Sequence, residues 1–392
     1  MEALDIVSGI TILMLIGIIL TLFSYKLKIS NVLFLLIAGL ILGGLNNTYN
    51  FLNISPVALV TIAIISLVII VFDGSSKFKS RSMDELSIKN LKLVTIFIFI
   101  NLLIFPFIIS YLFYGSINMT IFIYGFIFSV IMAATDPATL FFMLKNKTSK
   151  VIDALEIEAI LNTPITVLIP LLIIDALEIE LGFGLVKEYA LQFLTQILVG
   201  VGSGVVIGLI VVKAMKSYYN EELNPFALIT AALLAYVLAE NLEGSGILAV
   251  AILGFLFGKS IISNKKQLQN FSGMISYSME IIVFLLLGFI VSLDLSLGFI
   301  LKSIVLFIIL LFTRYLSVKI IYGKVFDEKQ RLFLTMAMPK GIATAVLLFA
   351  LSILNIPGLN IIIDLTILIM IYSLILITIA SFKAEKLIGI KI

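Results

Sequence analysis

The sequence predicts an all-α polytopic membrane protein with about thirteen transmembrane helices, and three observations support this fold class. Of the 392 residues, 61% are hydrophobic and only 12% are charged, whereas a soluble domain carries about a quarter charged residues. Apolar runs of about 20 residues, the length that crosses a hydrocarbon core, recur along the whole chain. Lys and Arg gather in alternate loops between these runs. We therefore expect a single transmembrane domain over residues 1–392.

The apolar runs give the expected helices in order. The first follows the acidic start Met-Glu-Ala-Leu-Asp. A signal peptide starts with positive charge instead, so we expect this run to be a retained helix. The thirteen predicted spans are 5–24, 30–45, 55–73, 92–114, 120–144, 151–174, 188–213, 223–241, 244–262, 271–293, 298–321, 331–353 and 361–382.

Basic residues predict the orientation of the chain. Of the 26 Lys and Arg residues, 22 lie on the side of the loops that follow odd-numbered spans, only Lys187 and Lys302 lie on the other side, and Arg314 and Lys340 lie deep within spans. Because basic loops stay on the cytoplasmic side, the N-terminus is predicted outside and the C-terminus in the cytoplasm, in the cell membrane. Positive charge sorted in this way does not indicate a nucleic-acid partner.

Residue types that are absent exclude several classes of function. The chain has no cysteine and no histidine, which excludes thiolate and imidazole metal sites and His-dependent catalysis. It contains neither a P-loop nor a glycine-rich dinucleotide fingerprint. It also lacks the Gly-x-Gly-Asp context of intramembrane aspartyl proteases. We therefore expect no cofactor and no enzymatic activity.

Two of the predicted spans carry a helix break. Span five contains Thr-Asp-Pro, with Asp136 before the proline, and span twelve contains Pro339-Lys340-Gly341. A proline removes a backbone hydrogen bond, and a charge within a span is costly, so both need compensation. The two spans are seven helices apart and run in opposite directions. Broken helices of opposite direction predict inverted repeats that cross at a binding site.

The polar residues within the spans lie at a similar depth. At about 1.5 Å per residue, they lie about 10–16 Å from the cytoplasmic ends of their helices. Acids at that depth can pair with the basic groups, which offsets much of the cost of burial. Glu156 either faces this layer or reaches back to the headgroups, and Glu280 is a structural partner or a ligand. The other members are Asp136, Glu158, Asn162, Arg314 and Lys340.

Six segments along the chain carry a family resemblance. They are "FDGSSKF" at 72–78, "ATDPATL" at 134–140, "EAILNTP" at 158–164, "GSGILAVAILGFLFG" at 244–258, "TRYLSV" at 313–318 and "PKGIATA" at 339–345. In this order they resemble segments of the cation–proton antiporter superfamily, in its archaeal and bacterial sodium/proton exchanger branch. The resemblance covers nearly the whole chain.

The resemblance implies a role for each matching residue. Asp136 would be the membrane carboxylate that exchanges a cation for protons. Glu158 would pair with Arg314. Lys340 stands where the family usually has arginine, whose planar guanidinium binds carbonyls and carboxylates in a two-bond geometry that an ammonium cannot form. Asn162 would brace the unwound crossing. The residues implied at the cation are Asp136, Thr135, Asn162, Thr163 and Asp73.

Three departures from the family pattern leave two interpretations open. Thr163 replaces the second motif acid, Ala159 replaces a serine, and Asp73 is one methylene shorter than the usual glutamate. In one interpretation the protein is a working exchanger of Na⁺ or K⁺, since a carboxylate, carbonyls and a hydroxyl can still bind a hard cation. In the other it transports a different substrate, or it is a non-transporting sensor or partner subunit.

The resemblance also implies an architecture and partners. A mobile core of about 92–174 and 298–382 would slide, elevator-like, against a scaffold of about 1–91 and 188–293. The scaffold would form a homodimer. The expected partners are a monovalent cation, protons and the lipid bilayer.

Overall fold

The computed structural model describes most of the chain, and every regular element in the described residues is helical. These residues are 2–27, 29–49, 55–77, 85–136, 139, 149–178, 186–217, 220, 222–353 and 356–389. The α-helices are α1 (Glu2–Leu27), α2 (Asn31–Tyr49), α3 (Pro56–Ser76), α4 (Glu85–Ile109), α5 (Met119–Ile131), α7 (Lys150–Glu178), α8 (Val186–Ser217), α9 (Leu223–Asn241), α10 (Gly246–Lys259), α11 (Lys265–Ile290), α12 (Leu297–Tyr322), α13 (Glu328–Met336), α14 (Ile342–Ile353), α15 (Asn360–Phe382) and α16 (Ala384–Ile388). A π-helix, η1 (Ser110–Tyr114), continues α4.

Twelve of the thirteen predicted spans coincide with one helix or with a broken one, and the described part of the fifth, residues 120–136 and 139, begins with α5. By length and composition, eight helices of the described residues can cross a membrane, and three more are apolar but shorter. The chain is therefore a polytopic all-α membrane protein, as predicted. Thirteen as the number of crossings, and the inverted repeat, stay predictions.

Both helices expected to be broken are interrupted at the expected places. The twelfth span consists of α13 and α14, with residues 337–341 non-helical between them. The fifth span begins as α5, which ends at Ile131, and residues 132–136 are not helical. These two segments, 132–136 and 337–341, are called the first and second break below.

The chain forms two compact units. The first comprises residues 1–60, 83–167 and 281–392, and the second comprises residues 61–82 and 168–280. The predicted core and scaffold concern relative motion and stay a prediction.

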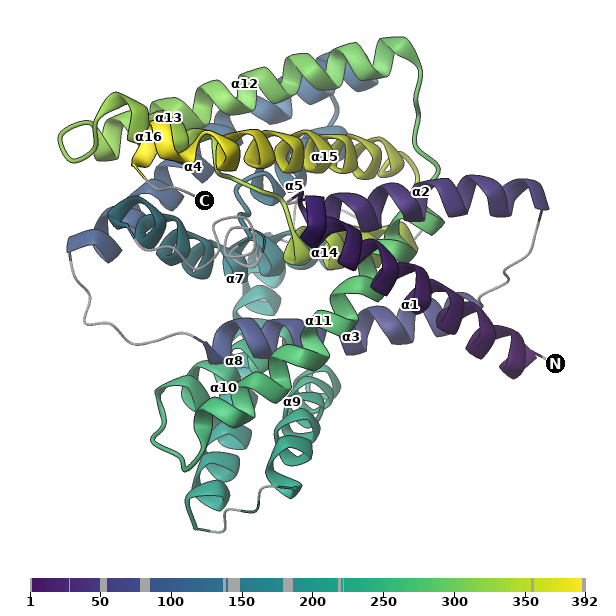
Figure 1. Cartoon of the computed structure of the whole chain (residues 1–392), viewed down its shortest axis with the longest axis vertical. Coiled ribbons are helices and arrows are strands. Elements are labelled where there is room, and N and C mark those ends of the chain that lie inside the picture. The colour runs from purple at the N-terminus through teal and green to yellow at the C-terminus, as the bar shows by residue number, and fades with distance from the viewer. Residues whose placement is uncertain are drawn as a thin grey trace. The chain divides into compact units, whose positions relative to one another are not determined.

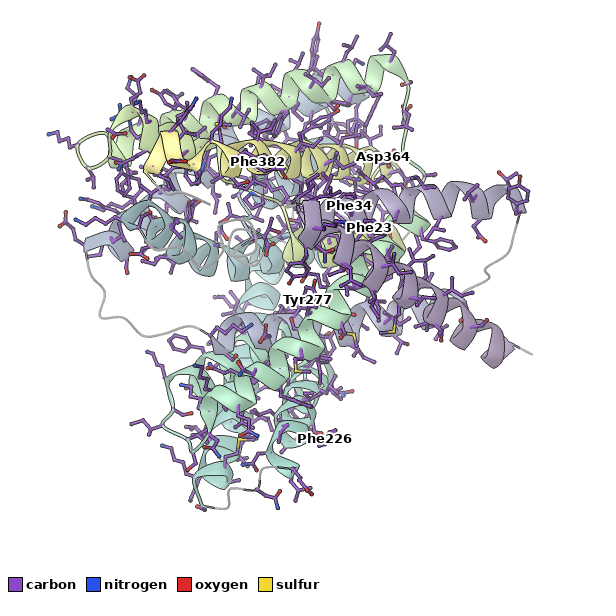
Figure 2. The ribbon with its side chains drawn as sticks, in the orientation of Figure 1. Phe23, Phe34, Phe226, Tyr277, Asp364 and Phe382 are labelled. Carbon is purple, nitrogen blue, oxygen red and sulfur yellow. The ribbon has the colours of Figure 1, made fainter. Side chains whose placement is uncertain are left out.

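The first unit has a core of buried side chains from α4, α7, α12, α13, α15 and α16. Tyr322 and Phe333 are completely buried in it. Figure 1 shows α12, α13, α15 and α16 side by side, and Figure 2 shows Asp364 and Phe382 near opposite ends of α15. This packing fixes α13, and with it one end of the second break.

The second unit has its own core, made by α3, α8, α9, α10 and α11. The rings of Phe72 and Phe257 meet there with centroids 5.8 Å apart. Helices α8 and α10 approach closely because Gly204 has no side chain: a Cβ at this position would overlap the backbone carbonyl of Ala249.

Candidate functional site

The first and second breaks lie against each other in the first unit. The backbone N–H of Asp136 donates to the Pro339 carbonyl over 3.0 Å. The Lys340 ammonium donates to the carbonyls of Met132 and Ala134, each over 2.6 Å. The two segments that the sequence marks by proline are therefore joined through backbone and side chain.

The end of α5 explains why a lysine is stable at this place. The last carbonyls of a helix have no partner within it and carry partial negative charge. After Ile131 the chain tightens, with Ala134 N–H donating to the Ile131 carbonyl over 3.0 Å. The carbonyls of Met132 and Ala134 then bind Lys340, whose side chain is completely buried. The ammonium thus compensates buried carbonyls that the end of α5 leaves without a backbone partner.

Asp136 is buried, with 6% of its surface exposed. Its Oδ2 accepts a hydrogen bond from the Thr139 backbone N–H over 2.9 Å and a short one from the Thr139 hydroxyl. A carboxylate that accepts from the N–H three residues later is the usual N-cap of a helix, and Thr139 is itself helical. Asp136 therefore accepts from the backbone in the way an N-cap residue does, an arrangement that favours a negative charge.

Gly341 leaves the space that the Asp136 carboxylate occupies. A Cβ at position 341 would overlap the carboxyl group of Asp136. The second break thus contributes a residue without a side chain where the first break presents its acid.

Asn162, on α7, braces the first break. Its Nδ2 donates to the Ala133 carbonyl over 2.9 Å and to the Thr135 hydroxyl over 2.8 Å. Its Oδ1 is buried and has no hydrogen-bond partner within the described part of the chain. An amide oxygen left in this condition is costly unless a ligand satisfies it. Thr135 and Asn162, both expected at the cation, therefore lie together beside Asp136.

Glu158 and Arg314 form a buried two-bond ion pair between α7 and α12. Each Arg314 terminal nitrogen lies 2.6 Å from one Glu158 oxygen. The side chains are 1% and 0% exposed, and the Phe97 ring centroid lies 5.1 Å from the guanidinium carbon. The pair that the sequence suggested is present, one helical turn from Asn162.

Four predicted residues belong to the second unit or have side chains outside the described residues. Asp73 and Glu280 belong to the second unit, where both are buried. The side chains of Thr163 and Glu156 lie outside the described residues.

Two residues that sequence reasoning did not assign to the site also contribute. Thr139 holds the Asp136 carboxylate, and the Ser373 hydroxyl accepts from the Lys340 backbone N–H over 3.1 Å. The signal for Thr139 was available, since Asp before Pro with a polar residue at the third helical position is typical of a helix start. Ser373 has no comparable signal, because it is one of several hydroxyl residues on α15.

The donor set of the cluster is made of oxygen atoms. Within the described residues, no group of three or more His, Cys, Asp or Glu side chains could hold a metal. One carboxylate with an amide oxygen, hydroxyls and carbonyls suits a hard monovalent cation better than a transition metal.

The chain resembles known transporters in sequence. The family model described as "Sodium/hydrogen exchanger, transmembrane" matches residues 10–383. "Probable Na(+)/H(+) antiporter 2" of Methanocaldococcus jannaschii is 28% identical over 71% of this chain and 68% of that protein. The "K(+)/H(+) antiporter NhaP" of Alkalimonas amylolytica is 25% identical over 74% of this chain, which spans half of that longer protein.

A solved structure has the same fold. The sodium proton antiporter MjNhaP1 from Methanocaldococcus jannaschii superimposes with a TM-score of 0.81 over 96% of this chain and all of that one, at 22% identity.

Proposed function

The chain belongs to the sodium/hydrogen exchanger family, and we propose that it exchanges a monovalent cation, Na⁺ or K⁺, for protons by alternating access. The relatives are named as Na⁺/H⁺ and K⁺/H⁺ antiporters, which are transporters and not enzymes. The observation that supports the proposal most is the buried Asp136 carboxylate where the two breaks meet.

The cation would bind between Asp136 and the oxygens beside it. Asn162 Oδ1, which is buried and unsatisfied among the described atoms, would be one ligand. The Thr135 carbonyl would be another, while the Thr135 hydroxyl is already bonded to Asn162. Thr163 would add a hydroxyl in place of the family's second acid, and Asp73 would be a further ligand.

Exchange follows from the cost of moving a bare charge. Moving a carboxylate through hydrocarbon without a counter-charge costs at least about 3 kcal/mol of free energy. Asp136 would therefore cross only when it holds a proton or a cation. Each passage one way with a cation is then matched by a return with a proton, without both being bound together.

The wider architecture is proposed on the family's pattern. The core, residues 92–174 and 298–382, would move elevator-like against a dimeric scaffold, residues 1–91 and 188–293. The N-terminus would lie outside and the C-terminus in the cytoplasm of the cell membrane, as the distribution of basic residues predicts. The chain would work without a cofactor or nucleic acid.

Transport is tested in proteoliposomes that contain a pH-sensitive dye and an imposed pH gradient. We expect Na⁺ or K⁺ to collapse the gradient, with Li⁺ compared in parallel. Asp136→Asn should abolish this response, whereas Glu85→Gln, which changes an exposed acid, should not. No response of the unmodified protein to any of the three ions would contradict the proposal. So would coupled exchange that persists in Asp136→Asn.

Thr163 supports an alternative, in which the chain carries another substrate or acts as a non-transporting sensor or partner subunit. This alternative expects no alkali-ion exchange in the natural protein. It also expects Thr163→Asp, which restores the family's acid, to create Na⁺-dependent proton flux. Exchange in the unmodified protein contradicts it.

A further inference from the structure

The two breaks are followed by similar short sequences. The first break ends at Asp136 and continues as Pro-Ala-Thr, and the second ends at Gly341 and continues as Ile-Ala-Thr. Thr139 and Thr344 are therefore the third residues after the two breaks. Both are buried, with 3% and 2% of their surfaces exposed. The two hydroxyls thus occupy equivalent places in the two broken spans.

Gly341 holds the N-cap position of α14. Its carbonyl accepts the first hydrogen bond of the helix, from the Ala345 N–H over 3.0 Å. An N-cap side chain normally accepts from the first-turn N–H groups, and glycine has none to offer. A Cβ at this position would overlap the Asp136 carboxyl group. The carboxylate of the first break thus fills the space where the N-cap side chain of α14 would begin, a place that favours negative charge.

This arrangement sets the direction of the Thr344 side chain. At a helix start, the N-cap side chain and the side chain three residues later lie on the same face, as in a capping box. Thr344 is the third residue after Gly341, and the Asp136 carboxylate stands in for the missing N-cap side chain. The Thr344 side chain is therefore on the face of α14 that meets Asp136.

The hydroxyls of the two threonines differ in what they bind. The Thr139 hydroxyl donates to Asp136 Oδ2. Thr344 Oγ1 is buried and has no hydrogen-bond partner among the described atoms, and the same holds for Asn162 Oδ1. Buried oxygens in this condition cost free energy unless a ligand satisfies them. An amide oxygen can only accept, and a hydroxyl oxygen has two lone pairs, so a cation satisfies both.

We propose that the Thr344 hydroxyl is a ligand of the cation at Asp136, so that both broken spans supply oxygens to one binding site. The inference rests on the proposed function, because it names a further ligand of the same site. Asp136 and Asn162 bind the cation from the side of the first break, and Thr344 binds it from α14. One carboxylate with neutral amide and hydroxyl oxygens is a donor set for a hard monovalent cation.

The test compares cation dependence in proteoliposomes. Thr344→Val removes the hydroxyl at nearly constant volume. We expect it to raise the Na⁺ or K⁺ concentration for half-maximal exchange about tenfold, as for loss of one polar contact. The maximal rate should not change, which is the pattern of a lost binding contact. Thr344→Ser keeps the hydroxyl and should restore the natural value.

Thermal unfolding in detergent gives the same comparison without transport, as NaCl or KCl replaces choline chloride at constant ionic strength. The cation should raise the melting temperature of the unmodified protein, and Thr344→Val should need about tenfold more of it. In choline chloride alone, Thr344→Val should melt no lower than the unmodified protein, because its hydroxyl has no partner to lose. This second readout separates a ligand from a structural residue.

Thr335 provides a matched control in the same broken span. It is also buried, with 4% of its surface exposed, but its hydroxyl donates to the Arg331 carbonyl over 2.9 Å. Thr335→Val should therefore leave the half-saturating cation concentration unchanged in both assays.

Three outcomes overturn the inference while the proposed function stands. They are an unchanged half-saturating concentration in Thr344→Val, a lower melting temperature of Thr344→Val in choline chloride alone, and an equal shift in Thr335→Val. Failure of the proposed function is distinguishable from all three. In that case the unmodified protein responds to neither cation, in exchange or in melting temperature, and the ligand role of Thr344 is contradicted with it.

Discussion

The buried pair of Glu158 and Arg314 allows the sharpest prediction about stability. Both side chains are almost completely inaccessible, and two 2.6 Å bonds join them. Arg314→Met leaves the Glu158 carboxylate buried without its partner, which costs about 3–5 kcal/mol. Because unfolding entropy grows with chain length, that cost corresponds to a melting temperature lower by about 4–6 °C. Thermal unfolding in detergent, followed by circular dichroism, measures the shift.

The double variant separates pairing from packing. Glu158→Met combined with Arg314→Met replaces the ion pair by apolar groups of similar length, a change that is often neutral or stabilising. We therefore expect the double variant to recover most of the stability that either single variant loses. Additive losses in the double variant, or a loss below about 1 kcal/mol in Arg314→Met, would refute the reasoning that the pair acts as a unit.

Three further predictions concern the two breaks. Gly341→Ala should sharply reduce exchange, because the new methyl group overlaps the Asp136 carboxylate, while Gly298→Ala, which has open space around it, should not; transport assays compare the two at equal protein content. Lys340→Met should lower stability by about 1–3 kcal/mol, because two buried carbonyls lose their donor; Lys340→Arg, which keeps the charge, should lose less in the same thermal assay. Thr139→Val removes the hydroxyl donor to Asp136 at nearly constant volume and should slow exchange about tenfold, and Thr139→Ser should restore the rate.

The location of the breaks could be predicted from the sequence, because proline and glycine act locally. Pro339 and Gly341 interrupt an apolar run, and the non-helical residues are found there. The pairing of Glu158 with Arg314 was implied by the resemblance to the antiporter superfamily, and the similar depth of the two residues agreed with it. The structure contains this pair.

The individual partner atoms of Lys340 and Asp136 could not be predicted in that way. The sequence left both acids and free carbonyls at a helix end open as partners of Lys340, and the ammonium binds the Met132 and Ala134 carbonyls. The position of the Lys340 ammonium depends on the backbone conformation after α5 and on which backbone atoms of the first break contact the second break. Residue type alone predicts neither. For Asp136, the proline suggests a broken helix, and the hydrogen bond from the Thr139 N–H adds that the carboxylate accepts as an N-cap does.

Fixed groups compensate charge and free carbonyls around the site. Arg314 offsets Glu158, and Lys340 binds the buried carbonyls of Met132 and Ala134 just after α5. Asp136 accepts hydrogen bonds from the N–H and the hydroxyl of Thr139. In the exchange proposed above, a cation and a proton would compete for this carboxylate, while the Glu158–Arg314 pair and Lys340 would keep the two breaks in place.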